Sequence, residues 1–387
     1  GVCRVALTEE DRLGRDLFIQ WCKEVGCTIE VDAMGNIFAR RAGQQNHLPP
    51  ILIGSHLDSQ PTGGKFDGVL GVLAGLEVLE TLNDHQVVTQ HPVEIVSWTN
   101  EEGARFAPAM IASGVFSGDF SLEYAYSRKD KEGRSLGDEL ERIGYKGTLS
   151  VGNRPYKATF ELHIEQGPIL EAEELPIGIV TGVQGIRWYD LIITGKETHA
   201  GPSPMPLRKD PVAGSLPVLT AIYGLAQKYS PDARVTIGYL DASPGTRNTV
   251  PGQLTISIDL RHPEESSLAA MHEDLQEIVH RAGSEGKLEL QLTDIWYAPA
   301  VAFDAACIAA VKGATEVLKT PAMEMVSGAG HDAVYVSKVA PTSMIFIPCK
   351  DGLSHNELES AKQEDVTAGG NVLLHAVLKM AQMSGNS

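Results

Sequence analysis

The segment Gly54–Asp67, which reads GSHLDSQPTGGKFD, constrains this chain more than any other. It follows the short apolar run Ile51–Ile53, which is typical of a buried strand in a parallel sheet. Ligands of open α/β sheets bind beyond the carboxyl ends of the strands, so chemistry is expected where His56, Asp58 and Asp67 follow this strand. An imidazole and two carboxylates suit a divalent metal ion. The alternative is a turn whose Asp and Ser side chains cap the next helix.

The composition narrows the class of protein. A chain of 387 residues, 43% of them hydrophobic, is long enough for two domains with real cores. The formal net charge of -18 argues against nucleic acids and anionic membrane surfaces as partners. Five scattered cysteines without a CxxC pair fit a reducing compartment. No signal peptide and no apolar run of membrane-spanning length, roughly 18–20 residues, is visible, so we expect a cytoplasmic globular protein.

Strand and helix patterns follow one another along the outer parts of the chain. A capping box at Thr8 opens a helix that should end near Gly26, and a hairpin over residues 28–40 turns at Gly35-Asn36. Further strands are expected at residues 51–53, 93–98, 159–164 and 342–347, and helices at 68–82, 136–143 and 304–318, with a final one through 378. These elements predict an α/β catalytic domain whose mixed, largely parallel sheet is flanked by helices.

The character of the chain changes near Gly182. Strands are expected at residues 188–194, 234–240 and 253–260, and helices at 211–227 and 266–282. Two helices with several largely alternating strands indicate a smaller α+β sandwich inserted into the first domain. The predicted domains are therefore residues 1–182 with 300–387, and residues 183–299.

Four clusters of acidic and histidine side chains follow predicted strands or lie in a loop near one. They are His56/Asp58/Asp67, Glu101/Glu102, His163/Glu165 and His355/Glu357. Capping and salt bridges explain most single clusters, but four at equivalent strand ends favour a functional site. If Glu101 and Glu102 are locally extended, their side chains point in opposite directions, so one can bind metal while the other faces a bound water. That is the layout of a general base beside a Lewis acid.

Five motifs in the chain resemble those of a known family. They are GSHLDSQPTGGKFDG, WTNEEGARFAPAM, ELHIEQGP, the THAGPSPM segment with Arg208-Lys209-Asp210, and LSHNE. In this order they resemble the amidase/hydantoinase–carbamoylase family, which includes N-carbamoyl-L-amino acid hydrolases, β-ureidopropionases and allantoate amidohydrolases. The family belongs to the aminoacylase/carboxypeptidase-like metallopeptidase clan. The resemblance covers nearly the whole chain, from about residue 10 to about residue 380.

The resemblance implies a site with two divalent metal ions per subunit, for which zinc, manganese, cobalt and nickel are candidates. The implied ligands are His56, Asp67, Glu102, His163 and His355. Asp67 would bridge the ions, Asp58 would orient His56 from behind, and Glu101 would be the general base. Peptidases of the wider clan usually carry Asp at the position of His163, so this histidine points to the carbamoylase branch.

Other residues would bind the substrate. His199 resembles a family histidine that crosses a dimer interface to polarise the scissile carbonyl, although a histidine in such a turn more often has a structural role. Asn248 and Arg261 resemble residues that hold a substrate carboxylate, which the guanidinium pairs bidentately. A lone Arg that ends a strand is otherwise more often part of a surface salt bridge. Gln166 would lie near the carbamoyl group, and Gly330 would form part of a tight turn lining the pocket.

The implied activity is that of a metal-dependent amidohydrolase. It would cleave the N-carbamoyl group of N-carbamoyl-L-amino acids, or of N-carbamoyl-β-alanine, by way of a metal-bridged water, to give amino acid, carbon dioxide and ammonia. Alternatives are an allantoate or ureidoglycolate amidohydrolase, a dipeptidase or aminoacylase, and a non-catalytic binding dimer. The protein would be a homodimer, in which the inserted domain serves as a lid and dimerisation domain and completes the neighbouring site.

Overall fold

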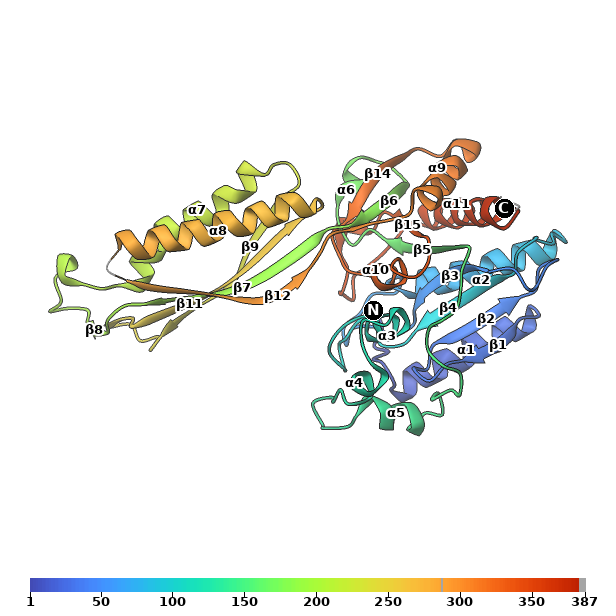
Figure 1. The fold of residues 1–387 in the computed structure, drawn as a ribbon, viewed down its shortest axis with the longest axis horizontal. Helices are drawn as coiled ribbons and strands as arrows, with labels where there is room; N and C mark the ends of the chain where they lie inside the picture. The colour runs from blue at the N-terminus through green and yellow to red at the C-terminus, as the bar shows by residue number, and fades with distance from the viewer. Residues whose placement is uncertain (287, 383–387) are drawn as a thin grey trace. The chain divides into compact units, whose positions relative to one another are not determined.

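The computed structural model of the chain describes residues 1–286 and 288–382. The chain forms two compact units (Figure 1). The large unit comprises Gly1–Gly182 and Ala302–Ser387, and the small unit comprises Val183–Val301. The sequence placed the return to the first domain at residue 300, two residues before the boundary in the structure.

The large unit is built on one mixed sheet. Its strands are β1 (Thr28–Val31), β2 (Ile37–Arg41), β3 (Ile51–His56), β4 (Val93–Trp98), β5 (Ala158–Ile164), β6 (Ile177–Val183), β13 (Val301–Ala302), β14 (Ala322–Ser327) and β15 (Thr342–Ile347). The strand order is β1-β2-β4-β3-β5-β15-β6-β13, and β14 also pairs with β6. The central strands β4, β3, β5 and β15 run parallel, whereas β2 pairs antiparallel with β4, and β6 pairs antiparallel with β15. The carboxyl ends of the four parallel strands therefore meet at one edge.

Helices cover both faces of this sheet. They are α1 (Glu9–Glu24), α2 (Val69–Asp84), α3 (Ile111–Ser117), α4 (Leu122–Tyr126), α5 (Leu136–Arg142), α6 (Ile169–Ala172), α9 (Ala305–Leu318), α10 (Asp332–Val336) and α11 (Gln363–Gln382), with a short 3-10 turn η2 (Lys350–Gly352). Ile51 and Ile53 of β3 face the core that includes α2, α9 and α11, whereas Leu52 faces the core that includes α3 and α10. The expected α/β fold with a largely parallel sheet between helices is confirmed.

Two local features set the position of helices in the large unit. The hydroxyl of Thr8 accepts a hydrogen bond from the amide of Asp11, which satisfies an otherwise free donor and starts α1 at the next residue. A Cβ on Gly71 of α2 would lie 2.6 Å from the carbonyl oxygen of Leu162 on β5. The absence of a side chain there lets α2 approach the strand that carries His163.

The small unit has its own core. Its elements are β7 (Gly185–Thr194), β8 (Thr198–His199), the 3-10 turn η1 (Met205–Leu207), α7 (Pro211–Lys228), β9 (Arg234–Ser243), β10 (Thr249–Val250), β11 (Gln253–His262), α8 (Glu265–Glu285) and β12 (Glu289–Ala298). The main sheet is antiparallel with the order β12-β7-β11-β9. Helices α7 and α8 lie along one face of it (Figure 1), where Leu191, Ile222 and Leu268 belong to one buried cluster. This is the α+β arrangement that the sequence predicted.

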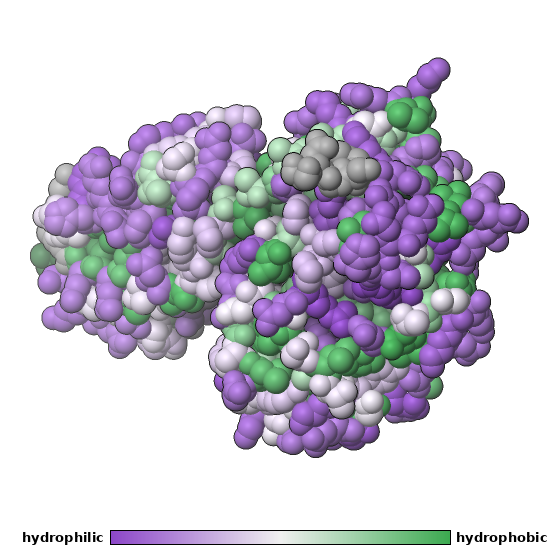
Figure 2. Space-filling view, turned by 45° about the vertical axis from the view of Figure 1, so that its right-hand side comes forward, coloured by the Kyte–Doolittle hydropathy of each residue, from purple (hydrophilic) through white to green (hydrophobic). Residues whose placement is uncertain are grey.

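The helices, the surface and the cysteines show three further features of the chain. Within residues 1–286 and 288–382, no helix is both long and apolar enough to cross a membrane. On the face that Figure 2 shows, hydrophilic residues predominate and hydrophobic residues form scattered patches. All five cysteines are free thiols, and only Cys3 is exposed.

Candidate metal centre

The parallel strands bring two histidines to one edge of the large sheet. His56 is the last residue of β3, and His163 is the last but one of β5. The register places Ile53 opposite Phe160, so the two histidines, each three residues further on, stand at the same level. The centres of their rings are 6.2 Å apart. The topology of the sheet therefore brings both imidazoles to the same edge.

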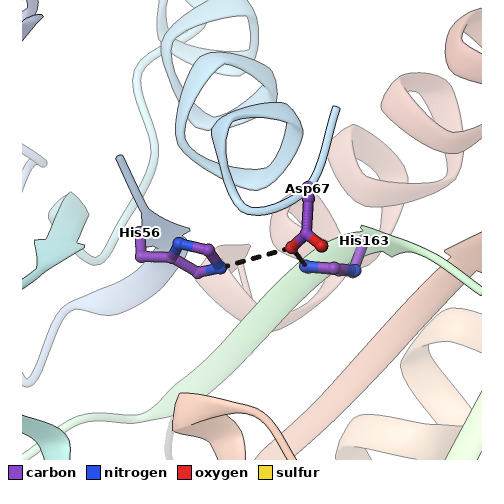
Figure 3. A group of neighbouring side chains, drawn as sticks. All are labelled: His56, Asp67 and His163. Atoms are coloured by element: carbon purple, nitrogen blue, oxygen red, sulfur yellow. Dashed lines mark ion pairs between the residues drawn. The ribbon is translucent and has the colours of Figure 1, made fainter. Parts of the chain in front are cut away.

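His56, Asp67 and His163 form a buried group, which we call the inner group (Figure 3). Asp67 lies two residues before α2, and its Oδ1 is 3.6 Å from Nε2 of His56 and 3.2 Å from Nε2 of His163. Figure 3 shows both rings turned toward the same carboxylate. One ligand atom from each residue lies within 4.8 Å of the other two. Such a set can bind one metal ion.

Hydrogen bonds orient both imidazole rings. Nδ1 of His56 lies 2.9 Å from the carbonyl oxygen of Asp58, and Nδ1 of His163 lies 2.9 Å from that of Ile164. Since carbonyl oxygens only accept, we assign the ring proton to Nδ1 in both residues. The amide of Gly68 donates to Nε2 of His163 at 3.1 Å, which agrees with this assignment. Nε2 of each ring therefore faces the inner group, where it would be the metal-binding atom.

Asp67, Glu102 and His355 form a second group, which we call the outer group. Nε2 of His355 is 3.5 Å from Oδ2 of Asp67 and 3.2 Å from Oε2 of Glu102. The side chain of His355 is 52% exposed, whereas that of Asp67 is 4% exposed. The inner group uses Oδ1 of Asp67 and the outer group uses Oδ2. Asp67 therefore has the geometry of a carboxylate that bridges two ions.

The charges of this cluster suit divalent cations. Burial by itself would raise the pKa of Asp67, but hydrogen bonds with His163 and His56 hold that pKa well below its usual value. Burial by itself would lower the pKa of His56, but Glu101 and Asp67 raise it well above its usual value. Several buried carboxylates in contact with imidazoles need positive charge, which either protons or cations supply. This set of oxygen and nitrogen donors fits zinc, manganese, cobalt or nickel.

Asp58 and Gln60 hold the segment that carries the two glutamates. The carboxylate of Asp58 accepts hydrogen bonds from the amides of Glu101 and Glu102, both at 3.2 Å. The backbone amide and side-chain amide of Gln60 donate to the two carboxylate oxygens of Glu102 at 3.1 and 2.7 Å. The sequence predicted that Asp58 orients His56. In the structure the Asp58 carbonyl oxygen makes that contact, while its carboxylate lies 3.8 Å from Nδ1 of His56.

Glu101 lies beside the inner group. Its Oε2 is 3.5 Å from Nε2 of His56, and the residue is 8% exposed. Burial raises the pKa of Glu101 well above its usual value; His56 opposes this shift, whereas Asp332 adds to it. A carboxyl group with a raised pKa can take up and release a proton near neutral pH. The position and environment of Glu101 are compatible with the predicted role of general base, which stays a prediction.

Gln166 and Gly330 also belong to the large unit. The side-chain amide of Gln166 donates to Oδ2 of Asp67 at 2.9 Å and to the hydroxyl of Ser354 at 3.1 Å. Its Oε1 has no hydrogen-bond partner among the described residues. A Cβ on Gly330, in the loop between β14 and α10, would come within 2.9 Å of Cε of Met110. Gln166 therefore adjoins the outer group, and Gly330 marks a close approach of two loops.

Ser354 and Glu359 both contact Asp67, and neither was predicted from the sequence. The Ser354 hydroxyl donates to Oδ2 of Asp67 at 2.6 Å. Glu359 is 1% exposed, and its carboxylate accepts from the amides of Phe66 and Asp67 at 2.8 and 3.1 Å. Both lie on the loop of His355. Ser354 belongs to the LSHNE motif and Glu359 follows it by two residues, so this motif is the sequence signal that could have indicated them.

His331 follows Gly330 in the loop between β14 and α10 and was not among the predicted site residues. Its ring packs edge-on against that of His163, with centres 4.6 Å apart, and its Nε2 lies 3.1 Å from the hydroxyl of Ser327. Glu161, His163 and His331 also lie at ligand spacing. Burial lowers the pKa of His331 well below its usual value, and His163 lowers it further. A neutral His331 ring therefore packs behind the inner group.

Two of the acidic residues in the predicted clusters lie outside the centre. The carboxylate of Glu165 accepts from the amides of Ile169 and Leu170, both at 2.8 Å, and so caps the short helix α6. Glu357 is exposed, and the buried carboxylate of that loop belongs to Glu359, two residues later. For Glu165 the capping alternative is the one that the structure supports.

The small unit holds the remaining predicted residues. The short strands β8 and β10 place His199 opposite Thr249, and the amide of Ala200 donates to the carbonyl oxygen of Asn248 at 2.8 Å. His199 and Asn248 are therefore neighbours at one end of the unit, and both are exposed.

Arg261 lies at the opposite end of this unit. It is opposite Ile186 at the start of β7, while β8 follows the end of that strand. Its guanidinium pairs with the carboxylate of Asp259, at 2.8 Å for the shortest contact. Within one chain the structure separates Arg261 from His199 and Asn248.

Comparison with known proteins connects this geometry to a family. Residues 52–379 match the model of peptidase family M20/M25/M40. The chain belongs to this family. An N-carbamoyl-L-amino-acid amidohydrolase of Rhizobium meliloti is 47% identical over 384 residues, which cover 98% of this chain and 91% of the relative. An allantoate amidohydrolase of Bacillus subtilis is 32% identical over 383 residues, which cover 98% and 93%.

A solved structure is also similar to this M20/M25/M40 protein over nearly its whole length. It is a Burkholderia multivorans protein described as an amidase of the hydantoinase/carbamoylase family. The two chains superpose with a TM-score of 0.97 at 54% identity, over 99% of this chain and 93% of the other. The resemblance that the five motifs indicated is thereby confirmed, and the protein is a hydrolase of the amidohydrolase type.

Proposed function

We propose that this M20/M25/M40 protein hydrolyses N-carbamoyl-L-amino acids, or N-carbamoyl-β-alanine, to the amino acid, carbon dioxide and ammonia. The observation that carries the proposal is the pair of ligand groups around Asp67, with Glu101 beside the inner one. The names of the Rhizobium relative and the Burkholderia amidase support a carbamoyl substrate.

In the proposed site, His56, Asp67 and His163 would hold one divalent ion per subunit, and Asp67, Glu102 and His355 would hold a second. When bound, the ions supply Lewis acidity, which lowers the pKa of a water molecule and polarises the substrate carbonyl. The chain contributes two imidazoles whose Nδ1 atoms are held by carbonyl oxygens, and a carboxylate with one oxygen for each group. Zinc, manganese, cobalt and nickel all suit these donors.

Glu101 is the proposed general base and acid. It takes the proton of the water that attacks the ureido carbonyl carbon, and returns it to the amine nitrogen as the carbon–nitrogen bond breaks. The raised pKa of Glu101 allows it to keep the proton between these steps. The products are the free amino acid and carbamate, which decomposes to carbon dioxide and ammonia.

The remaining residues are proposed to bind the substrate. Arg261 pairs with the substrate carboxylate in the bidentate way that its planar fork favours, and Asn248 assists. His199 stabilises the negative charge that develops on the carbonyl oxygen, an effect that is typically worth a few kcal/mol. Gln166, whose Oε1 is free among the described residues, and Gly330 contact the carbamoyl end.

We further propose a homodimer in which His199 of the partner subunit completes each site. The ladder from Ile186, opposite Arg261, to Thr194 spans eight residues, or about 26 Å at about 3.3 Å per residue, and β8 lies beyond it. An amino-acid-sized substrate therefore cannot contact Arg261 and His199 of one chain together. A two-fold symmetric dimer supplies the two residues from different chains.

A substrate panel tests the proposed reaction. Ammonia release is measured with manganese- or zinc-loaded protein on several N-carbamoyl-L-amino acids with one D-enantiomer, N-carbamoyl-β-alanine and allantoate. An N-acetyl amino acid and a dipeptide are assayed for amine release. We expect chelator-sensitive turnover of carbamoyl substrates only. Turnover of the acetyl or peptide substrates instead would overturn the proposal.

Glu101→Ala tests the assignment of the base. The variant should lose nearly all turnover, by roughly a hundredfold or more, because proton transfer by a positioned side chain contributes on that order. Its metal content should stay close to that of the wild type, because Glu101 belongs to neither ligand group. The check is steady-state kinetics together with metal analysis by mass spectrometry. Retention of more than a few per cent of activity would show that another group is the base.

Allantoate is the second candidate substrate, because the Bacillus relative is an allantoate amidohydrolase. It carries the same ureido group and a carboxylate, so the site residues would keep their roles. A higher kcat/KM for allantoate than for every carbamoyl amino acid in the panel would transfer the proposal to this substrate.

A cytoplasmic location is also proposed. Its support is the state of the five cysteines, which are all free thiols, four of them buried. Free thiols are typical of reducing compartments. Fractionation of the native cell, followed by immunodetection of the protein, tests this assignment.

A further inference from the structure

Glu359 is a buried carboxylate with no part in the proposed reaction. It is 1% exposed and lies four residues after His355. Its Oε1 accepts hydrogen bonds from two consecutive amides, those of Phe66 at 2.8 Å and Asp67 at 3.1 Å. Hydrogen bonds to a charged acceptor are stronger than neutral ones. Glu359 therefore holds the backbone at the residue that both ligand groups share.

The loop before Asp67 closes tightly around this carboxylate. A Cβ built on Gly64 would lie 1.9 Å from the carboxyl carbon of Glu359 and 2.0 Å from each of its oxygens. No side chain fits at position 64 while the carboxylate is in place. The need for glycine there follows from the presence of Glu359.

Ser354 provides a second link between the two loops. Its hydroxyl donates to Oδ2 of Asp67 at 2.6 Å and lies 3.3 Å from Oε2 of Glu359. The loop that carries His355 is therefore attached to Asp67 at two points, through its backbone by Glu359 and through its side chain by Ser354.

We propose that Glu359 is a positioning residue that fixes Asp67 and joins it to the loop of His355, and thereby keeps the outer group in its geometry. The outer group depends on this link most, because Asp67 and His355 lie on the two segments that Glu359 joins. In the inner group, His56 and His163 are held by strands β3 and β5. The inference rests on the proposed two-ion site but is independent of the substrate.

Zinc binding to Glu359→Ala and Glu359→Gln, measured by competition with a chromophoric chelator, tests this role. The wild type should bind two ions. Loss of contacts behind metal ligands typically weakens binding about 10- to 100-fold, so Glu359→Ala should lose affinity for the outer ion in that range and for the inner ion by less than about threefold. Glu359→Gln should keep most of the affinity, because its amide oxygen still accepts from both backbone amides. At saturating zinc, kcat and KM should return close to the wild-type values, since Glu359 touches no reacting atom.

Asp304→Ala is a matched control. The Asp304 carboxylate also accepts from two backbone amides, those of Ala306 and Cys307, both at 2.9 Å, but it caps α9 and lies on no ligand loop. It should lower Tm and leave both zinc affinities unchanged. The inference is overturned if Glu359→Ala binds both ions as the wild type does, or if Asp304→Ala loses the outer ion to the same extent.

Gly64→Ala probes the same contact without changing Glu359, and it keeps the test decisive if Glu359→Ala fails to fold. Its methyl group displaces the carboxylate, so the outer ion should again bind more weakly. Wild-type affinity for the outer ion in Gly64→Ala would contradict the inference. A wild type that binds two ions but hydrolyses no carbamoyl substrate would refute the proposed function and leave this inference standing. A wild type that binds fewer than two ions would refute both.

Discussion

Asp332, the residue after His331, is a fully buried carboxyl group with little compensation for a charge. The hydroxyl of Ser113 donates to its Oδ1, and its Oδ2 has no hydrogen-bond partner among the described residues. Burial raises the pKa of Asp332 well above its usual value, and the nearby Glu161 raises it further. The folded chain therefore keeps this proton at pH values where the unfolded chain has released it.

This difference predicts a pH dependence of stability. Between the unfolded pKa, about 3.9, and the raised folded pKa, the folded state binds more protons, so the free energy of unfolding falls as pH rises. Asn at this position does not ionise. The Tm of Asp332→Asn relative to the wild type should therefore increase from about pH 5 to about pH 8, as measured by calorimetry in the presence of chelator.

Asp130→Asn is the control with the opposite sign. Burial by itself would raise the pKa of Asp130, but the amide of Arg134 and the guanidinium of Arg105 hold that pKa below its usual value. Its contribution is present above the unfolded pKa and is lost as pH falls, so Asp130→Asn should lose most Tm at neutral pH. A Tm difference for Asp332→Asn that does not change with pH would contradict the role of its burial.

Single residues of the centre could be anticipated where a strand fixes them. His56 and His163 end parallel strands, and the alternation of a strand with its register decides where such side chains lie. The structure brings them together with Asp67, although their role in metal binding stays a prediction. Glu359 could not be anticipated, because the loop after His355 has no periodicity that tells whether Glu357 or Glu359 turns inward.

At the scale of elements, α1 is attached to the large unit by a buried ion pair. Arg15 and Asp11 are both fully buried, with 2.9 Å between Nε and Oδ2. Arg15 also donates to the carbonyl oxygen of Gly35 at 2.8 Å and to the hydroxyl of Thr99 at 3.2 Å. Thr99 precedes Glu101 and Glu102, so α1 supports the β1–β2 turn and the start of the segment that carries these glutamates together.

Arg15→Met should be strongly destabilising. Removal of one partner leaves the Asp11 carboxylate buried without its cation, which typically costs about 3–5 kcal/mol. Guanidinium chloride unfolding measures the change. Arg12→Met is the matched control, because Arg12 pairs with Glu9 and Asp16 on the helix surface, where ion pairs exposed to water contribute little to stability. Equal losses of unfolding free energy in the two variants would show that the buried pair contributes no more than the surface pairs.

Most elements that the sequence predicted have a clear period or a continuous apolar run, such as α7, α8, β3, β4 and β5. The buried strand β6 also has an apolar run but was missed. Strand β12 was missed because it is an edge strand: only Leu290 and Leu292 pack against the core, and residues 293–297 are exposed. Helices α3, α4 and α10, of five to seven residues, were missed, although α5, which is as short as α3, was predicted. Long helices and strands can thus be predicted mainly from their sequence pattern, whereas short elements depend on the residues that pack around them.

At the scale of the whole molecule, the proposed exchange of His199 between subunits predicts complementation. His199→Ala and Glu101→Ala should each be nearly inactive alone. After equal amounts are mixed and subunits exchange, half of the dimers combine one chain of each kind and hold one intact site, so about a quarter of wild-type activity should appear. Kinetics with a parallel measurement of dimer mass provide the check. If the mixture stays inactive although mixed dimers form, His199 serves the site of its own chain.

The length of the small sheet has a further consequence. Two residues added to each of its paired strands would leave every side chain on its present face and carry His199 about 7 Å further from Arg261. One residue added to each strand would move the following side chains to the opposite face of the sheet and expose the core residues. The length of the sheet can therefore change only by two residues at a time. Proteins built on this plan can change the reach of His199 through the sheet only in steps of that size.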